Sequence, residues 1–131
     1  MTPSTVRDKL KTALNVTGLR VYDTIPDNVI PPAAVIGQIS IDWDLVFKRG
    51  ADTGSLDVVV IAGRMSERAA QDYLDNLLTA TGNSSIKTKI EADQTLDGSV
   101  TSVRCTRAEP ISVTVSGVEM LAYRFVVEVY G

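Results

Sequence analysis

The segment "SLDVVVIAGRMSERAAQDYLDNLL", residues 55–78, decides the fold class. Its first half contains five consecutive apolar residues, 58–62, and a run without alternation is typical of a central strand covered on both faces. Its second half predicts an amphipathic helix that Ser66 caps and Gly82 ends. The apolar positions of that helix recur at intervals of three and four: Ala70, Tyr73, Leu74, Leu77 and Leu78. A buried strand followed directly by a one-sided helix predicts a domain of mixed α and β structure.

The flanking sequence extends this pattern in both directions. Pro3 suits the first position of a helix that Thr2 caps. The N-terminal part predicts a helix at 3–14, strands at 19–23, 33–39 and 38–47, and loops at 24–32 and 48–54. The C-terminal part predicts a short helix at 85–92, with Ile86 and Ile90 inward, and strands at 100–108, 111–115 and 118–130. Pro110 marks an edge or a break in the sheet.

These elements predict a single α+β domain that fills residues 1–131. The sheet is mostly antiparallel or mixed, has about six strands and carries two to three helices. The core face of the last strand has five members: Leu121, Tyr123, Phe125, Val127 and Val129. Its other face carries Val118, Met120 and Val126 and is therefore too apolar for a solvated surface. Two or three helices cannot cover both faces of a six-stranded sheet. We therefore expect a partner subunit to cover part of 58–62 and 118–126.

Composition removes several classes of chemistry. The 131 residues contain no histidine and one cysteine, Cys105, so His-based catalysis, Ser-His-Asp machinery and the usual zinc sites are excluded. A net charge of −3 with scattered basic residues argues against a phosphate-binding nucleic-acid protein. No nucleotide-binding glycine motif is present. We expect no catalytic residue, no cofactor and no metal.

Two short motifs still suggest chemistry. Asp52-Thr53-Gly54 spells the D-T-G tripeptide of aspartic proteases, and in the retroviral type each subunit of a homodimer supplies one such aspartate and the two share a proton. Here the tripeptide follows a charged turn instead of an apolar strand, so a surface loop of turn-forming residues is the favoured interpretation and the protease a remote alternative. Asp42 and Asp44 could hold a divalent cation, but a solvated strand face with Trp43 packed inward is the simpler interpretation.

The N-terminal segment, residues 1–14, lacks the apolar core of a signal peptide. No apolar run approaches the ~20 residues of a membrane span. We therefore expect synthesis in the cytoplasm and no association with a membrane.

Several segments in order resemble the tail terminator proteins of long, non-contractile-tailed (siphovirus) phages of actinobacteria. The R-G-A-D loop at 49–52, the apolar strand that ends in Gly63-Arg64, and the helix rich in R-A-A-Q carry the resemblance. The segments 19–37, 85–100 and 115–131 also fit it, so the resemblance covers nearly the whole chain.

The resemblance implies a structural virion protein of the tail and neck, assembled in the host cytoplasm. Such a protein forms a ring, expected to be hexameric, that stops polymerisation of the tail tube protein and joins the head-tail connector or stopper protein. DNA passes through the lumen without specific binding, which suits a net negative charge. A head-completion or connector-stopper protein of the same neck is the alternative, and a dimeric binding module remains a third possibility. The expected contact residues for subunit, tube or lumen lie in one loop: Lys48, Arg49, Gly50, Asp52, Thr53 and Gly54.

Overall fold

The structure is a computed structural model that describes residues 2–14, 19–22, 32–43, 52–64, 68–79, 85–96, 98, 100–115 and 117–130. Three helices and six strands follow one another along these residues. Their order is α1 (Pro3–Ala13), β1 (Arg20–Tyr22), β2 (Ala33–Ile36), β3 (Ser40–Asp42), β4 (Thr53–Arg64), α2 (Arg68–Leu77), α3 (Ile86–Glu91), β5 (Ser102–Val115) and β6 (Val118–Tyr130). The predicted α+β class is confirmed.

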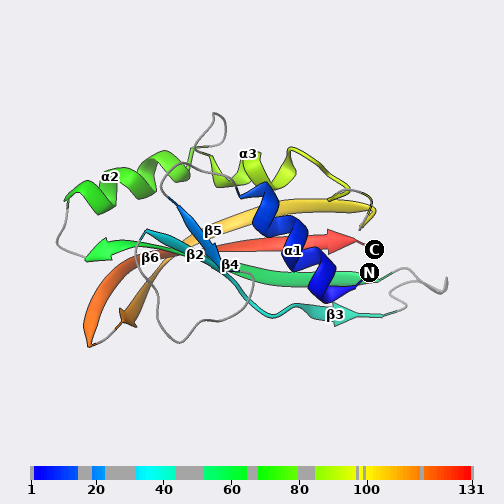
Figure 1. The fold of residues 1–131 in the computed structure, drawn as a ribbon, viewed down its shortest axis with the longest axis horizontal. Coiled ribbons are helices and arrows are strands. Elements are labelled where there is room, and N and C mark those ends of the chain that lie inside the picture. The colour runs from blue at the N-terminus through cyan, green and yellow to red at the C-terminus, as the bar shows by residue number, and fades with distance from the viewer. Residues whose placement is uncertain are drawn as a thin grey trace.

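The sheet is built around β4 (Figure 1). The strand order is β1-β2-β4-β6-β5, and β3 joins β4 on the same side as β2. Only β1 and β2 are parallel, and all other pairs are antiparallel. β4 pairs with β6 along nearly its whole length and, on its other side, with β3 at 53–55 and with β2 at 58–61, so the apolar run at 58–62 does lie in a central strand. Of the predicted cover on both faces, the described helices supply one face, and Val59 on the other face is half-buried. β5 forms one edge of the sheet, and β1 and β3 lie at the opposite edge.

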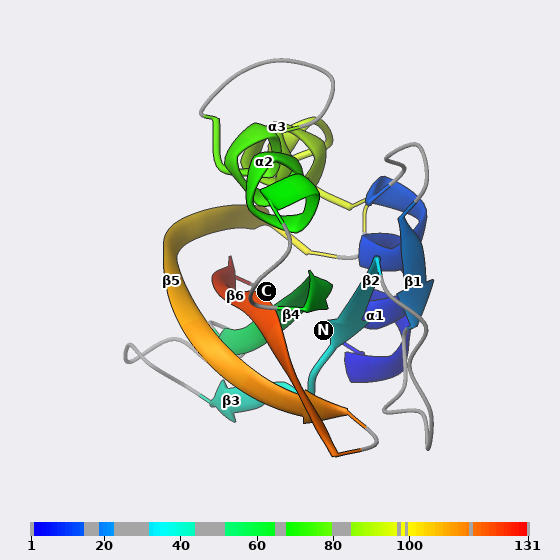
Figure 2. The same ribbon diagram turned by 90° about the vertical axis from the view of Figure 1, so that its left-hand side faces the viewer.

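The three helices pack on one face of this twisted sheet (Figures 1 and 2). Alternate residues of β4 and β6 point toward them, including Val58, Val60 and Phe125, which are at most 2% exposed. The helices contribute the other half of the core, with seven buried apolar side chains: Val6, Leu10, Ala70, Leu74, Leu77, Ile86 and Ile90. The inward positions predicted for α2 and α3 are confirmed for Ala70, Leu74, Leu77, Ile86 and Ile90, whereas Tyr73 and Leu78 are half-buried.

A single long strand replaces two predicted ones near the C-terminus. The predicted strands at 100–108 and 111–115 are both part of β5, and Pro110 sits inside it opposite Tyr123. Proline cannot donate to a neighbouring strand, but β5 is the edge of the sheet and needs donors on one side only. Pro110 therefore marks an edge, and the predicted break is wrong.

The predicted loop at 48–54 is wrong at its C-terminal end. Thr53 and Gly54 already belong to β4, and Thr53 pairs with Asp42 of β3 and with Tyr130 of β6. The strand therefore starts two residues earlier than the turn-forming composition indicated. The remainder of that loop, residues 48–51, lies outside the described residues, as do Ser66 and Gly82, the expected cap and stop of α2.

Candidate functional site

The side of the sheet opposite the three described helices is the first candidate surface. Directly opposed residues of neighbouring strands share a face, so one row across this side consists of Val35, Val59, Arg124 and Glu109. The next row contains Asp57, Val126 and Arg107. We call these seven residues the helix-free face. It mixes half-buried valines with charged side chains, so it is neither a closed apolar core nor a fully charged surface.

The charged side chains of this face form one network. Arg124 hydrogen-bonds Glu109 and lies 3.9 Å from Asp57, and Arg107 lies 2.9 Å from Glu109. Two acids and two arginines balance one another, so the network is neutral. The side chain of Glu109 is 22% exposed, whereas Arg107 is 69% exposed. Exposed pairs of this kind contribute at most about 1 kcal/mol each, so the network stabilises the fold only modestly.

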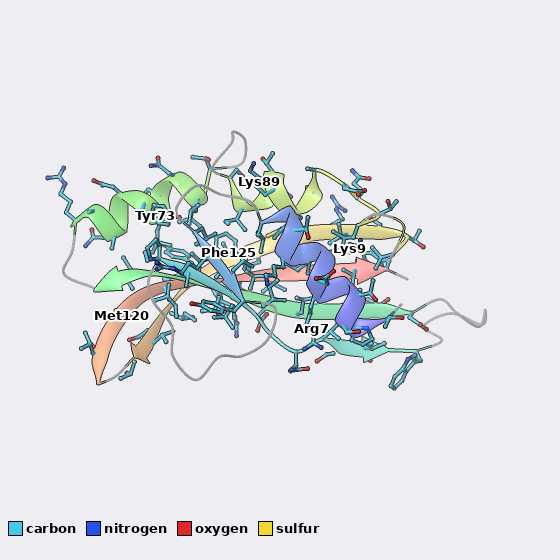
Figure 3. The ribbon with its side chains drawn as sticks, in the orientation of Figure 1. Arg7, Lys9, Tyr73, Lys89, Met120 and Phe125 are labelled. Carbon is cyan, nitrogen blue, oxygen red and sulfur yellow. The ribbon has the colours of Figure 1, made fainter. Side chains whose placement is uncertain are left out.

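Toward the β5–β6 hairpin the same side of the sheet becomes apolar. Ile61 and Ala122 face each other there and are buried, at 3% and 0% exposure. Ile111 and Met120 lie beside them and remain half-exposed. Figure 3 places Met120 near the end of the hairpin, away from the helices, whereas Phe125 lies between sheet and helices. The apolar character that the sequence predicted for 118–126 is therefore present on this side of the sheet, but Ile61 and Ala122 are already buried within the single chain, and only half-exposed side chains such as Met120 remain for a partner to cover.

The expected contact loop is only partly within the described structure. Lys48, Arg49 and Gly50 lie outside it, and Asp52 is the half-buried residue that precedes β4. Gly54 is buried between the side chains of Ile39 and Val129. A Cβ atom at Gly54 would lie 2.7 Å from Cδ1 of Ile39 and 2.8 Å from Cγ2 of Val129. Close packing therefore accounts for the glycine of the D-T-G tripeptide.

The other acidic motif departs from its predicted arrangement. Asp42 ends β3, and Trp43, expected to pack inward, is 72% exposed. The reason is that the pairing of β3 with β4 ends at Asp42 and Thr53, so Trp43 lies beyond the sheet. Asp44 falls outside the described residues. Within the described part of the chain, no group of three acidic or cysteine side chains is placed to hold a metal ion.

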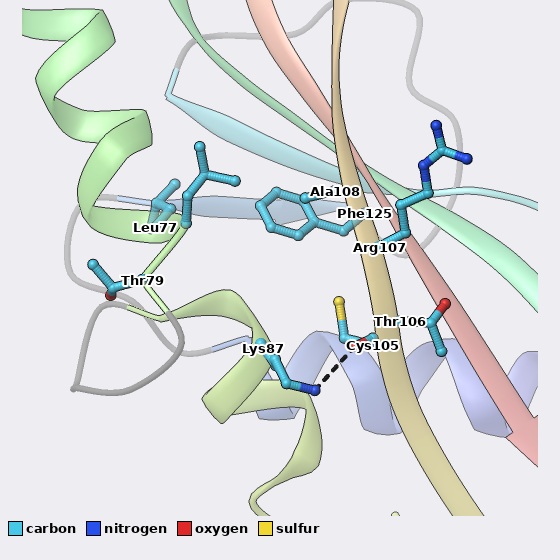
Figure 4. A pocket seen from close by; sticks show the side chains of 9 residues that line it. Leu77, Thr79, Lys87, Cys105, Thr106, Arg107, Ala108 and Phe125 are labelled. Carbon is cyan, nitrogen blue, oxygen red and sulfur yellow. Dashed lines mark hydrogen bonds between the residues drawn. The ribbon is translucent and has the colours of Figure 1, made fainter.

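A pocket of about 240 Å³ is the second candidate surface, and it lies beside the edge strand β5 (Figure 4). Leu77 and Leu78 line it from the end of α2, Phe125 from β6, and Cys105 and Ala108 from β5. The remaining four lining residues are polar: Thr79, Lys87, Thr106 and Arg107, whose guanidinium group points away from the pocket in Figure 4. The wall is thus largely apolar, and the Lys87 ammonium group stands at its margin.

Two side chains of α3 bind the backbone of β5 at this pocket. The amide N–H of Cys105 donates to Glu91 over 3.0 Å, and its carbonyl accepts from the Lys87 ammonium over 3.1 Å. Lys87 also donates to Glu91, its partner four residues along the helix. Unpaired backbone N–H and C=O groups of an edge strand can pair with another chain, and at Cys105 both groups are hydrogen-bonded by these two side chains. We call Lys87 and Glu91 in this arrangement the clamp. The clamp fixes α3 against the strand next to the pocket.

The clamp and the pocket shift two pKa values in opposite directions. Burial alone would raise the pKa of Glu91, but hydrogen bonds from Lys87 and from the Cys105 amide, with the positive charges of Lys87 and Arg104, hold it below its ordinary value. Burial raises the pKa of the Cys105 thiol to about 11. Glu91 is therefore ionised and Cys105 is a protonated, weakly reactive thiol at neutral pH.

Sequence reasoning missed the clamp and the pocket. The Lys87–Glu91 spacing of four residues was visible and is typical of a helix-surface ion pair. Nothing in the sequence, however, places that pair against Cys105, which is fourteen residues farther along than Glu91.

The comparisons with known proteins add no family. No protein-family model and no curated protein matches this chain. None of the helices in the described ranges has the length and apolarity to cross a bilayer.

Proposed function

We propose that this chain is a structural assembly protein that forms the terminating ring of a siphovirus tail. The observation that carries the proposal is the helix-free face. A sheet with helices on one side only exposes a second side, and here that side combines half-buried Val35, Val59 and Val126 with the neutral network around Arg124. Such a surface is suited to cover by a neighbouring subunit. The kind of assembly is taken from the resemblance to tail terminators, which rests on several sequence segments that follow one another in the same order.

In this proposal the ring closes by head-to-tail contacts between identical subunits. One end of the ring caps the tail tube and stops its growth, and the other meets the head-tail connector. The net charge of −3 supports a lumen that does not bind phosphate groups, because like charges do not retain DNA as it passes.

Co-sedimentation separates the terminator from the connector-stopper alternative. The chain is mixed with polymerised tail tube protein in one experiment and with portal-adaptor complexes in the other. A terminator sediments with tube ends at about one ring per end and leaves the portal complexes in solution. Binding to the portal complexes alone would overturn the terminator proposal and support the stopper.

The R-G-A-D loop supplies a finer test. We expect Arg49→Ala combined with Asp52→Ala to leave the fold intact and to weaken ring formation or tube joining. Tube length measured by electron microscopy reports the effect, because uncapped tubes grow longer. The matched control is Ser55→Ala, an exposed position of β4 just beyond the loop. If the double variant still caps tubes at the normal length, the loop has no part in docking.

A further inference from the structure

The chain exposes a large aromatic side chain at one edge of the sheet and an apolar pocket at the other. Trp43 is 72% exposed directly after β3, and the pocket of about 240 Å³ lies beside β5. Figure 1 shows β3 and β5 at opposite edges, with β4 and β6 between them. We propose that Trp43 of one copy of this chain inserts into the β5 pocket of the next copy.

The size of the pocket suits an indole ring. An apolar cavity of about 150 Å³ is enough to hold benzene, so about 240 Å³ accommodates the larger bicyclic ring. The walls formed by Leu77, Leu78 and Phe125 provide apolar contact, and Figure 4 shows the Cys105 sulfur on the pocket side of β5. Tryptophan is also among the residue types that contribute most to protein interfaces.

Charge complements shape at this contact. Trp43 lies between Asp42, which is exposed, and Asp44 in the sequence. Lys87 stands at the margin of the pocket, and an ammonium group has three donors. Two of them are used within the described structure, toward Glu91 and the carbonyl of Cys105. The third can meet Asp42 beside the inserted tryptophan, and a cation near an indole is itself favourable.

The tryptophan that fills the pocket belongs, in this proposal, to another copy. Asp42, next to Trp43, is separated from β5 by β4 and β6, which is about 14 Å at ordinary strand spacing. That separation exceeds the reach of one side chain, so Trp43 cannot fill the pocket of its own chain. A contact between opposite edges of identical subunits is heterologous and generates a ring when the rotation closes. The inference therefore deepens the proposed ring and rests on head-to-tail association.

Fluorescence and assembly of designed variants test the contact. Trp43 is the single tryptophan of the chain, so its emission reports this site alone. We expect the emission to shift to the blue as the concentration rises and copies associate. Trp43→Ala and the pocket-filling Ala108→Phe should each raise the dissociation constant at least about 30-fold, as expected for a central interface residue. Ser112→Phe, exposed on β5 outside the pocket, is the matched control and should stay within about threefold of wild type.

The outcomes separate this contact from the proposed function. If rings form while Trp43 keeps the emission of an exposed indole and Ala108→Phe assembles normally, the contact is wrong and the ring stands. If the wild-type chain stays monomeric at its highest soluble concentration, the contact is also wrong, and co-sedimentation with tube ends still decides the terminator function. Circular dichroism of each variant confirms folding, which both substitutions should preserve because Trp43 and Ala108 are exposed.

Discussion

Gly54→Ala is expected to destabilise the fold because no space exists for a methyl group there. The added Cβ atom would lie 2.7 Å from Cδ1 of Ile39 and 2.8 Å from Cγ2 of Val129, against about 3.5–4.0 Å for ordinary carbon contacts. Ile39 can turn the end of its side chain away. Val129 cannot do so easily, because a β-branched side chain is stiff at χ1 and Val129 is the ladder partner of Gly54.

The cost follows from these contacts. Overpacking of a core site costs about 1–3 kcal/mol, and replacing a strand glycine returns roughly 0.5–1 kcal/mol of backbone entropy. We therefore expect Gly54→Ala to lower the free energy of unfolding by about 1–2 kcal/mol. For a chain of this length, that corresponds to a loss of about 3–10 °C in Tm.

Thermal and urea unfolding followed by circular dichroism measure this loss. All variants must be compared in the same oligomeric state, because association shifts apparent stability. The control Ser55→Ala, at the exposed next position, should stay within about 0.5 kcal/mol of wild type. Combining Gly54→Ala with Val129→Ala should cost less than the sum of the single changes, since it removes one of the two clashing atoms. A fully stable Gly54→Ala protein would refute the packing role and reopen a loop or catalytic role for the tripeptide.

Three further predictions concern the ion network and the clamp. Arg124→Leu should cost about 1 kcal/mol in urea unfolding, because it leaves the carboxylates of Glu109 and Asp57 without their cation, and Glu109→Gln added to it should restore part of the loss. Because folding lowers the pKa of the Glu91 carboxyl group, the stabilisation from its ionised form is complete above the ordinary pKa of 4.5 and is lost as the pH falls through the lower pKa of the folded state. The free energy of unfolding should therefore differ between wild type and Glu91→Gln at pH 7, and this difference should vanish in that acid range. The Cys105 thiol, with a pKa of about 11, should react with iodoacetamide far more slowly in the folded chain than after unfolding in urea, and equal rates would contradict its burial.

The fold could be predicted where local pattern and tertiary environment agree. The apolar run 58–62 predicted a central strand and lies in one, and the spacing of Leu74 and Leu77 defines one helix face. Predictions were wrong where the outcome depends on a neighbouring strand. Pro110 does not break β5, because no described strand lies on its outer side and needs its missing donor. Trp43 is exposed because the pairing of β3 with β4 stops at the residue before it.

The candidate surfaces were less accessible to sequence reasoning than the fold. An apolar surplus on 118–126 could be recognised from alternation alone, and it indicated a second face in need of cover. The network of Arg124, Glu109 and Asp57 could not be recognised from the sequence, because its members come from three strands whose register is set by tertiary packing. The pocket likewise requires α2, α3 and β5 to meet in space.

Native mass spectrometry of the purified chain, alone and with tail tube ends, with negative-stain images of the same samples, decides whether this chain forms the proposed ring. We expect a closed ring of identical copies, about six in number, with an open lumen. A compact dimer, or a chain that remains monomeric even in the presence of tube ends, would contradict it.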